Sequence, residues 1–361
     1  MKESIAILGG GNGAHAAAAD LTLRGYSVRL YENEKFAPNL KKVFETREIE
    51  LSGAAGNGIA KLDMVTSNLE EALAGVTYIF VTVPAFAHKA YADLLVPHVR
   101  DGQILFLLPG TMGSLVFWNT FKKAGVRKHI VIAETHTLPY ATRLDGPGKS
   151  LVMSRFNPLK FGVIPAQKTD ETIKKLSQFF DGLEPCESIV ACGLSSLNPI
   201  IHVPGCIMNA GRIEYAKGEF WFYREGVTRC VARATDAVDK ERIAILNKLG
   251  YASEVVARGI GNGIKSDDVY DVINGDENFA KIKGPADIKN RYYSEDIPYG
   301  MASWALIGKM LGVPCPMMEA MVNIGNVILE KNCWTDGNTL ADFGIDGMTL
   351  PQLHSYLQTG D

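Results

Sequence analysis

A short apolar run that leads directly into a glycine-rich turn constrains this chain more than any other feature. Residues 5–8 predict a buried strand, the turn Gly9-Gly-Gly-Asn-Gly-Ala14 follows at once, and the residues after the turn predict a helix. Gly9 permits the tight turn, Gly11 lets an anion approach the backbone, and Ala14 lets the helix pack closely on the strand. Because the first N–H groups of a helix lack partners within it, this turn predicts a pyrophosphate site. The residues expected to form it are Gly9, Gly11, Asn12, Gly13 and Ala14.

An acidic residue stands where dinucleotide sites require one. Ser27–Tyr31 predicts the second strand, and Glu32 follows it, about 20 residues after the glycines. A carboxylate there accepts hydrogen bonds from the ribose hydroxyls of NAD and repels the additional phosphate of NADP. Of the nearby cations Arg29 and Lys35, Arg29 is expected on the opposite face of its strand from Leu30. The sequence thus favours NAD(H) over NADP(H). The alternative to a dinucleotide site is an ordinary strand–helix turn.

The composition is that of a globular enzyme with about two domains. The chain has 361 residues, of which 47% are apolar and 21% charged, and a net charge of −3. This charge gives no electrostatic reason to expect nucleic acid or an anionic membrane as a partner. The six cysteines show no CxxC spacing, so we expect reduced thiols, no metal site and a cytoplasmic location. No signal peptide is apparent, and no apolar run approaches the ~20 residues of a membrane span.

The first half of the chain alternates strands and helices, which is typical of a parallel sheet with helices on both faces. The later strands are predicted at residues 63–66, 78–83, 103–108 and 129–133. Ligands bind outside the carboxyl ends of such strands, so the loops that follow them should line one crevice. These loops begin at Gly9, Pro84, Pro109 and Glu134, and Pro84, Pro109 and Gly110 are expected to contact the cofactor.

Local patterns refine this outline. Residues 48–60 predict a small hairpin, Ser67 and Glu70 a capping box that opens a helix, and residues 188–191 an edge strand. Beyond about residue 193, strand-like runs nearly vanish and amphipathic helical patterns dominate. The predicted helices there occupy residues 199–217, 226–250, 251–258, 265–273, 298–312 and 316–331. A second glycine cluster, 259–263, lacks a preceding strand and is expected to be a loop.

The chain is therefore predicted to contain a dinucleotide-binding α/β domain over residues 1–192 and an all-α domain over residues 193–361. The expected partners are small-molecule substrates. The oligomeric state stays open, with a homodimer as the candidate if the helical domain buries a dimer face.

A reaction at the cofactor also needs a proton donor, and residues 196–202 offer one. Asn198 before Pro199 predicts a helix start, with Asn198 as the N-cap. His202 lies four residues later, above Asn198 on the same face. Histidine titrates near neutral pH and can give up and recover a proton. Since a histidine near a helix start is more often simply packed or exposed, the pattern alone leaves both interpretations open.

The segment 290–300 is dense in polar and aromatic residues and precedes an apolar helix. Arg291 is either a surface charge or a clamp for a substrate carboxylate. Asp296 is either a helix cap or the carboxylate that orients His202 and raises its basicity. Periodicity cannot bring residues 202 and 296 together. Other aromatic residues are expected mostly in the core, with pocket lining as the alternative; they are Trp221, Phe222, Tyr223 and Trp304.

Several unusual segments, in the same order and in both domains, resemble the octopine and opine dehydrogenase family. They are 9–15, 83–88, 109–113, 134–140, 198–202, 209–214, and Arg291 with 295–300. The resemblance implies a Rossmann-type domain with a mostly parallel sheet, followed by a helical domain, with the active site between them. It implies that His202 is catalytic, that Asp296 is its partner and that Arg291 handles substrate. Asn198, on the same helical face as His202, is a further candidate substrate contact.

Members of this family join the amino group of an amino acid to a 2-oxo acid, commonly pyruvate, and reduce the resulting imine with NAD(P)H. The resemblance therefore implies an NAD(P)-dependent oxidoreductase acting on CH–NH bonds. Two alternatives remain. One is a simple 2-hydroxy acid or ketone dehydrogenase, which would usually carry a catalytic lysine. The other is a dinucleotide-binding protein without turnover.

Overall fold

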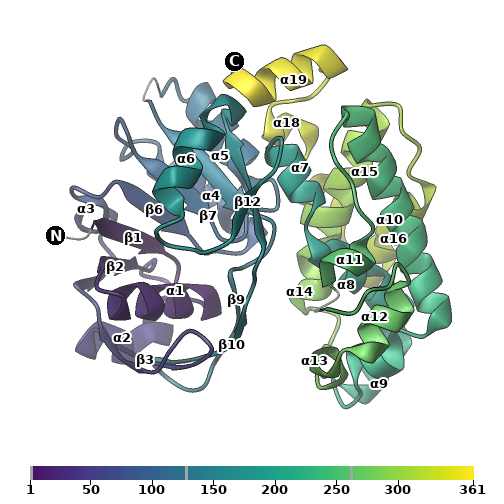
Figure 1. The fold of residues 1–361 in the computed structure, drawn as a ribbon, viewed down its shortest axis with the longest axis horizontal. Helices are drawn as coiled ribbons and strands as arrows, with labels where there is room; N and C mark the ends of the chain where they lie inside the picture. The colour runs from purple at the N-terminus through teal and green to yellow at the C-terminus, as the bar shows by residue number, and fades with distance from the viewer. Residues whose placement is uncertain (1–2, 127–128, 261–262) are drawn as a thin grey trace. The chain divides into compact units, whose positions relative to one another are not determined.

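The computed structural model describes residues 3–126, 129–260 and 263–361. Packing divides the chain into two compact units, Met1–Gly193 with Ser355–Asp361, and Leu194–His354 (Figure 1). The C-terminal residues thus pack with the first unit, whereas the sequence prediction assigned them to the second domain. Trp118 and Lys122 hold them there, because both side chains donate hydrogen bonds to the carbonyl of Gly360, at 2.9 and 3.2 Å.

The first unit is built on an eight-stranded, mostly parallel sheet with the order β5-β2-β1-β6-β7-β8-β11-β12. Only β11 runs antiparallel to its neighbour β8 within the pairs that join these strands. The strands β6 and β7 are buried throughout, as their continuous apolar sequences require. The bounds are β1 Ser4–Leu8, β2 Ser27–Tyr31, β5 Met64–Thr66, β6 Tyr78–Val81, β7 Ile104–Leu107, β8 Val131–Thr135, β11 Leu159–Ile164 and β12 Leu183–Pro185.

The first six of these strands follow the 3-2-1-4-5-6 order of the dinucleotide-binding fold. The order reverses between the neighbours β1 and β6, and ligands bind at such a switch point. Since β1, β6, β7 and β8 are parallel, the loops that follow them leave from one edge of the sheet. The segments predicted to share a crevice, which begin at Gly9, Pro84, Pro109 and Glu134, therefore lie along that edge.

Helices in the first unit connect these strands. The α-helices are α1 Asn12–Leu23, α2 Lys41–Thr46, α3 Leu69–Leu73, α4 His88–Leu95, α5 Gly113–Lys123, α6 Thr169–Leu176 and α7 Ile189–Leu194. The short 3-10 turns are η1 Ala37–Leu40, η2 Ala85–Ala87 and η3 Ala166–Lys168.

A second sheet of four strands, ordered β4-β3-β10-β9, packs on α1. The predicted hairpin is present as β3 (Glu48–Gly53) and β4 (Gly58–Lys61), but β3 also pairs in parallel with β10 (Lys149–Arg155). β9 (Tyr140–Leu144) completes the sheet. The buried carboxylate of Asp20 in α1 ties the layers together, because it accepts hydrogen bonds from the side chains of Tyr140 (2.7 Å) and Arg155 (2.6 Å).

Two local predictions in the first unit are wrong. The edge strand expected at 188–191 is the start of helix α7, and the edge position is taken by β12. The capping residue of α3 is Asn68, not Ser67, since the Asn68 side chain accepts from the backbone N–H groups of Glu70 and Glu71. Both errors arise where several adjacent residues have similar local propensities and tertiary packing selects among them.

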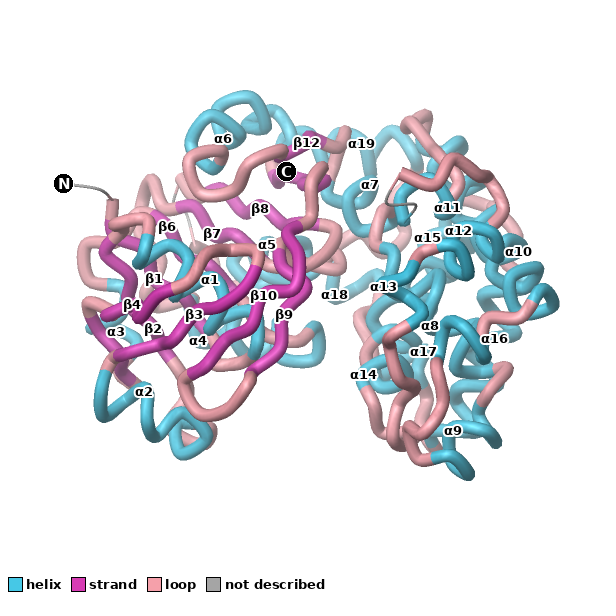
Figure 2. Tube along the Cα trace, turned by 60° about the horizontal axis from the view of Figure 1, so that its bottom comes forward, coloured by secondary structure: helices cyan, strands magenta, loops and turns pink. Residues whose placement is uncertain are grey.

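The described part of the second unit consists of helices and loops, and all named strands lie in the first unit (Figure 2). Two of its helical turns are π-helical, η4 Phe222–Gly226 and η5 Asp296–Met301. The α-helices are α8 Leu197–Ile207, α9 Ala210–Ala216, α10 Arg229–Leu249, α11 Val256–Ile260, α12 Val269–Gly275, α13 Glu277–Ala280, α14 Arg291–Ser294, α15 Ala302–Met310, α16 Pro316–Leu329, α17 Cys333–Asp336, α18 Leu340–Phe343 and α19 Leu350–Thr359, which extends into the C-terminal part of the first unit.

The helix that carries His202 begins earlier than predicted. Ser196 is the N-cap of α8, so Asn198 lies within the first turn and is not the cap. The glycine cluster is also only partly a loop, because Gly259 belongs to α11, while residues 261–262 lie outside the described residues.

One described helical stretch, Ile189–Ile207, has the length and mean hydropathy (1.3) of a membrane span, contrary to the expectation from sequence. Its most apolar window is 83% buried inside the protein, so the stretch matches a core helix equally well.

Candidate active site

His202 projects from the first half of α8 into a buried polar cluster of the second unit. The residue is only 6% exposed. Its Nδ1 lies 2.7 Å from Oδ2 of Asp296, and its Nε2 lies 3.1 Å from the hydroxyl of Tyr223. The ring of Tyr292 stacks on the imidazole with the centroids 3.5 Å apart and the planes inclined by 14°. The fold therefore brings together residues 202 and 296, which sequence periodicity could not do.

Asp296 is presented by the π-helical turn η5. Pro298 within this turn has no N–H to donate, which disfavours a regular α-helix there. Glycines let η5 approach its neighbours closely: a Cβ on Gly300 would lie 2.4 Å from the ring of Pro199, and a Cβ on Gly337 would lie 2.0 Å from the carbonyl oxygen of Pro298. Helix α8 and η5 are thereby packed tightly enough for the His202–Asp296 contact.

Tyr223 is presented by the other π-helical turn, η4. Its side chain is buried, and burial raises the pKa of its phenol well above the ordinary value, so the hydroxyl keeps its proton. Tyr223 also forms a side-chain hydrogen bond with Tyr292. Neither tyrosine is predicted from the sequence to be a neighbour of His202. The available signal was the density of aromatic residues at 220–223 and 292–293, which equally describes a core.

The two other predicted substrate residues lie nearby in the chain but make weaker contacts. Arg291, the first residue of α14, has a 58% exposed side chain whose Nε lies 3.4 Å from Glu295. Asn198 is half-buried in the first turn of α8. Each of them therefore has polar atoms accessible to a ligand, while His202 and Asp296 are committed to one another.

The glycine turn of the first unit fits a dinucleotide pyrophosphate. Gly9 has a φ of +112°, and a Cβ there would approach the carbonyl oxygen of Thr82 to 3.0 Å. A Cβ on Gly11 would meet no atom within 4 Å, so the turn is open at that point. Gly11 is the N-cap of α1, so no side chain at the cap accepts a hydrogen bond from the first N–H groups of the helix. The first turn also carries no acidic residue. The N-terminus of α1 thus presents its N–H groups without an acidic residue in its own first turn.

The other turn residues have structural contacts as well. A Cβ on Gly13 would lie 2.7 Å from Leu138, and Ala14 is fully buried against the sheet. The side-chain oxygen of Asn12 accepts a hydrogen bond from the backbone N–H of Leu144 in β9 (3.0 Å). These contacts fix the turn against both sheets.

Glu32 lies beside the turn with its carboxylate directed back at it. Its Oε2 is so close to Gly10 that a Cβ there would lie 2.6 Å away. Its Oε1 accepts hydrogen bonds from the backbone N–H of Asn33 (2.8 Å) and from Tyr91 (3.4 Å). Burial raises the pKa of Glu32. Arg29, as expected, is directed elsewhere and donates to the carbonyl oxygens of residues 71 and 74.

The loops after β6, β7 and β8 contain the remaining predicted cofactor residues. Pro84 precedes the turn η2, and the Leu108–Pro109 peptide is cis. Gly110 is required by packing, because a Cβ there would lie 2.2 Å from the side chain of Glu134. Glu134 itself is fully buried and accepts hydrogen bonds from the backbone N–H groups of Met112 (2.8 Å) and Ser114 (3.0 Å) at the start of α5. Burial raises the pKa of Glu134 to about 7.

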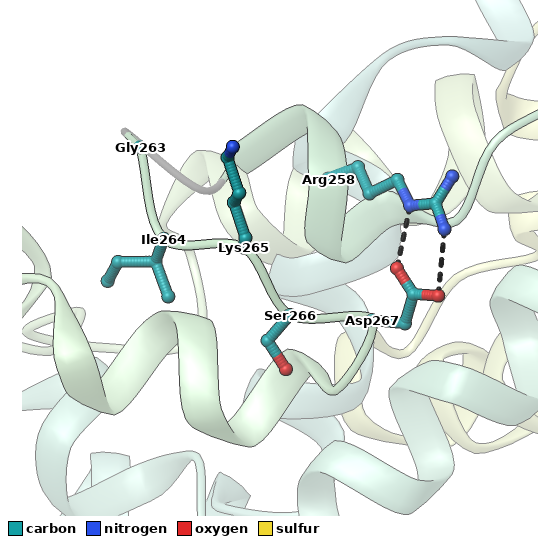
Figure 3. Close-up of a pocket in the computed structure, with 6 residues that line it drawn as sticks. All are labelled: Arg258, Gly263, Ile264, Lys265, Ser266 and Asp267. Carbon is teal, nitrogen blue, oxygen red and sulfur yellow. Dashed lines mark hydrogen bonds and ion pairs between the residues drawn. The ribbon is translucent and has the colours of Figure 1, made fainter.

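The described residues include a surface hollow but no metal-binding cluster. Among the described residues there is no group of three or more His, Cys, Asp or Glu side chains that could hold a metal. A surface hollow on the second unit is lined by Arg258 and by residues 263–267 (Figure 3). The Nε and Nη2 groups of Arg258 donate hydrogen bonds to the carboxylate of Asp267, at 2.6 and 2.9 Å. None of the residues that line the hollow is a predicted site residue.

The chain is similar to opine-forming enzymes along its length. Residues 185–329 match the family model of the NAD/NADP octopine/nopaline dehydrogenase alpha-helical domain. The chain is 26% identical over 358 residues to an opine dehydrogenase of Arthrobacter sp. (strain 1C), with 99% of each protein covered. An octopine dehydrogenase solved with NADH and agmatine has a TM-score of 0.79 and 20% identity, covering 100% of this chain and 98% of that one. A yersinopine dehydrogenase solved with NADP+ bound has a TM-score of 0.74 and 14% identity, covering 99% of this chain and 98% of that one.

The similarity covers the fold, which the chain shares with solved octopine and yersinopine dehydrogenases, and the helical domain that the family model matches. More particularly, the chain is a homologue of the octopine and opine dehydrogenases, and the predicted resemblance and fold class are confirmed.

Proposed function

We propose that this protein catalyses the reversible reductive condensation of an amino acid with a 2-oxo acid such as pyruvate, with NAD(H) as the preferred cofactor. The observation that carries the proposal is the buried 2.7 Å contact between His202 and Asp296 in a chain that also holds a dinucleotide turn. A hydride donor and a histidine held in place by a carboxylate are the two parts that this chemistry needs.

The cofactor would be held by the first unit. Its pyrophosphate would lie on Gly9–Ala14 and the N-terminus of α1, with the loops at Pro84 and at Pro109–Gly110 toward the nicotinamide end. When bound, NADH supplies the hydride that reduces the imine carbon. The carboxylate of Glu32, which faces the turn, would accept hydrogen bonds from the ribose hydroxyls and disfavour a phosphate there. This supports a preference for NAD(H) over NADP(H).

His202 would handle the proton. In the condensing direction, the amine adds to the oxo carbon to form a carbinolamine. Protonated His202 then gives its Nε2 proton to the carbinolamine oxygen, the C–O bond breaks, and water leaves. In the reverse direction neutral His202 removes a proton from the attacking water. Asp296 accepts a hydrogen bond from Nδ1 throughout and stabilises the imidazolium form.

Arg291 and Asn198 would contact the substrates. The planar guanidinium of Arg291 suits a substrate carboxylate, and both condensing partners carry one. The Arg291 side chain lies 3.4 Å from Glu295 and is 58% exposed, so it can reorient toward a ligand. Asn198 offers one amide donor pair and one acceptor on the face of α8 that carries His202.

We further propose a cytoplasmic enzyme of amino acid metabolism, with functional domains over residues 1–192 and 193–361. The six cysteines are all unpaired, which suits a reducing compartment. A homodimer remains a proposal that sedimentation can test.

The test is NADH oxidation with pyruvate alone and with pyruvate plus pooled amino acids. The proposal predicts oxidation only when an amine is present, and subdividing the pool then identifies the substrate. Oxidation with pyruvate alone would favour a simple 2-hydroxy acid dehydrogenase. Tight NADH binding without oxidation of any oxo acid and amine pair would favour a non-catalytic dinucleotide-binding protein.

A further inference from the structure

We propose that Tyr223 is a positioning residue for His202, which it serves by pairing with Nε2 in both protonation states of the imidazole in the free enzyme. The carbinolamine oxygen takes the place of the Tyr223 hydroxyl at Nε2 when the proton is transferred. The inference rests on the proposed function, in which His202 exchanges a proton during each turnover. It is carried by the 3.1 Å contact between the Tyr223 hydroxyl and Nε2, on the opposite side of the ring from Asp296.

The hydrogen-bond chemistry of the cluster sets the tautomer of neutral His202. An ionised carboxylate only accepts hydrogen bonds, so Nδ1 carries the proton that points at Asp296. Nε2 then holds a lone pair, and the Tyr223 hydroxyl donates to it. Burial keeps Tyr223 protonated by raising the pKa of its phenol. Nε2 is therefore the nitrogen that is ready to take up a proton.

The neighbouring Tyr292 allows the same contact to persist when His202 is charged. Protonated Nε2 donates, so the Tyr223 oxygen must accept and its own proton needs another acceptor. The side-chain hydrogen bond between Tyr223 and Tyr292 supplies one. Rotation of one hydroxyl thus satisfies the buried imidazole in either state, without an unpaired atom that would cost free energy.

The second unit contains several contacts that hold Tyr223 in place. Asn209 donates to the carbonyl oxygens of Gly205 in α8 (2.8 Å) and Gly226 in η4 (3.0 Å). Arg212 pairs with Glu225, which also accepts from the backbone N–H of Trp221 (2.9 Å). Asn209 and Arg212 belong to the segment 209–214 and Glu225 to η4. Within the described part of the chain, none of their hydrogen bonds or ion pairs reaches His202 or Asp296. Their role is understandable if the position of η4, and hence of Tyr223, matters.

Few other charges face His202. Asp296 in η5 is in direct contact, and Arg291 of α14 pairs with Glu295, the C-cap of that helix. Cys206, on the same helix as His202, is held as the neutral thiol because burial raises its pKa. On α10, Asp239 and Arg242 pair with each other and with backbone groups.

The experiment compares Tyr223→Phe with Tyr293→Phe. Tyr293 is a matched control, because its buried hydroxyl donates to the Cys206 carbonyl of the same helix α8 (2.7 Å) but does not touch His202. The readout is the pH profile of kcat/KM for NADH-driven condensation, which reports the free enzyme and needs protonated His202. Its high-pH limb should move about one unit lower in Tyr223→Phe, since the charged imidazole loses the stronger hydrogen bond. We expect kcat to fall about tenfold, because the histidine is less well held.

Tyr293→Phe should lower the thermal midpoint about as much as Tyr223→Phe does. It should leave the high-pH limb of the kcat/KM profile unmoved. Superimposable profiles for Tyr223→Phe and the wild type would overturn the proposal, as would an equal shift in Tyr293→Phe.

A second measurement does not depend on turnover. NMR of 15N-histidine-labelled wild-type protein, assigned with His202→Gln, should show neutral His202 protonated at Nδ1. The His202 resonances should titrate at lower pH in Tyr223→Phe. Neutral His202 protonated at Nε2 would refute the role of Tyr223. If the wild type showed no amine-dependent NADH oxidation, the proposed function would fail. The NMR titration would then still test whether Tyr223 pairs with Nε2 of His202.

Discussion

In the proposed function, the carboxylate of Glu32 is the side chain that distinguishes the two nicotinamide cofactors. It is directed at the glycine turn, with Oε1 held by Asn33 and Tyr91. We expect Glu32→Ala to weaken NADH binding by about tenfold or more and to improve NADPH binding, because two ribose hydrogen bonds are lost and a repulsive charge is removed. Fluorescence titration with both cofactors measures this. The exposed neighbour Glu34 provides the control, as Glu34→Ala should change neither affinity; an unchanged ratio in Glu32→Ala would contradict the assignment.

Residue identities at the site were predictable only in part. Gly9, Gly11 and Glu32 followed from spacing, because the dinucleotide motif is local in sequence. His202 and Asp296 followed from family resemblance, since nothing in their separate segments shows that they meet. Tyr223 could not be assigned in this way, because a buried tyrosine beside a histidine and one in an apolar core have the same local sequence.

At the scale of elements, one substitution in the glycine turn should change NADH affinity without changing the stability of the fold. A Cβ on Gly11 would meet nothing within 4 Å, and its φ of −80° suits any residue. We expect Gly11→Ala to leave the thermal midpoint within about 1 °C while weakening NADH by about tenfold or more, since the methyl group occupies the approach of the pyrophosphate. Gly211→Ala, which also places its Cβ in open space, is the control for both readouts. Normal NADH affinity in Gly11→Ala would place the cofactor elsewhere.

Helices and strands that are determined by local sequence were well predicted. Those that depend on contacts between distant segments were not. The strand–turn–helix unit and β2 appear where apolar runs and glycines place them. The parallel pairing of β3 with β10 joins segments far apart in the chain, and no periodicity encodes that pairing. The π-helical turn η5 depends on Pro298 together with the glycines of neighbouring segments, so a sequence window around Asp296 predicts an ordinary helix start.

At the scale of the whole molecule, the buried Glu134 should leave a signature in the pH dependence of stability. Burial raises its pKa in the folded state from 4.5 to about 7. Its contribution to stability is therefore fully present below about pH 4.5 and is lost as the pH rises through 7. Relative to Glu134→Gln, the wild type should lose about 3 kcal/mol of unfolding free energy between pH 5 and 8, measured by urea titration. Glu70→Gln, at an exposed site, should track the wild type; parallel curves for Glu134→Gln would contradict the shift.

The proposed role of His202 is that of the acid–base group in an amine-dependent condensation. Its most direct test is mass spectrometry of the product formed from 13C-labelled pyruvate, the active amino acid and NADH, with wild type and His202→Gln in parallel. We predict a product that contains both carbon skeletons, formed about 10² to 10⁴ times more slowly by His202→Gln while NADH affinity is unchanged. Labelled lactate in place of that product, or a His202→Gln rate near that of the wild type, would contradict the account.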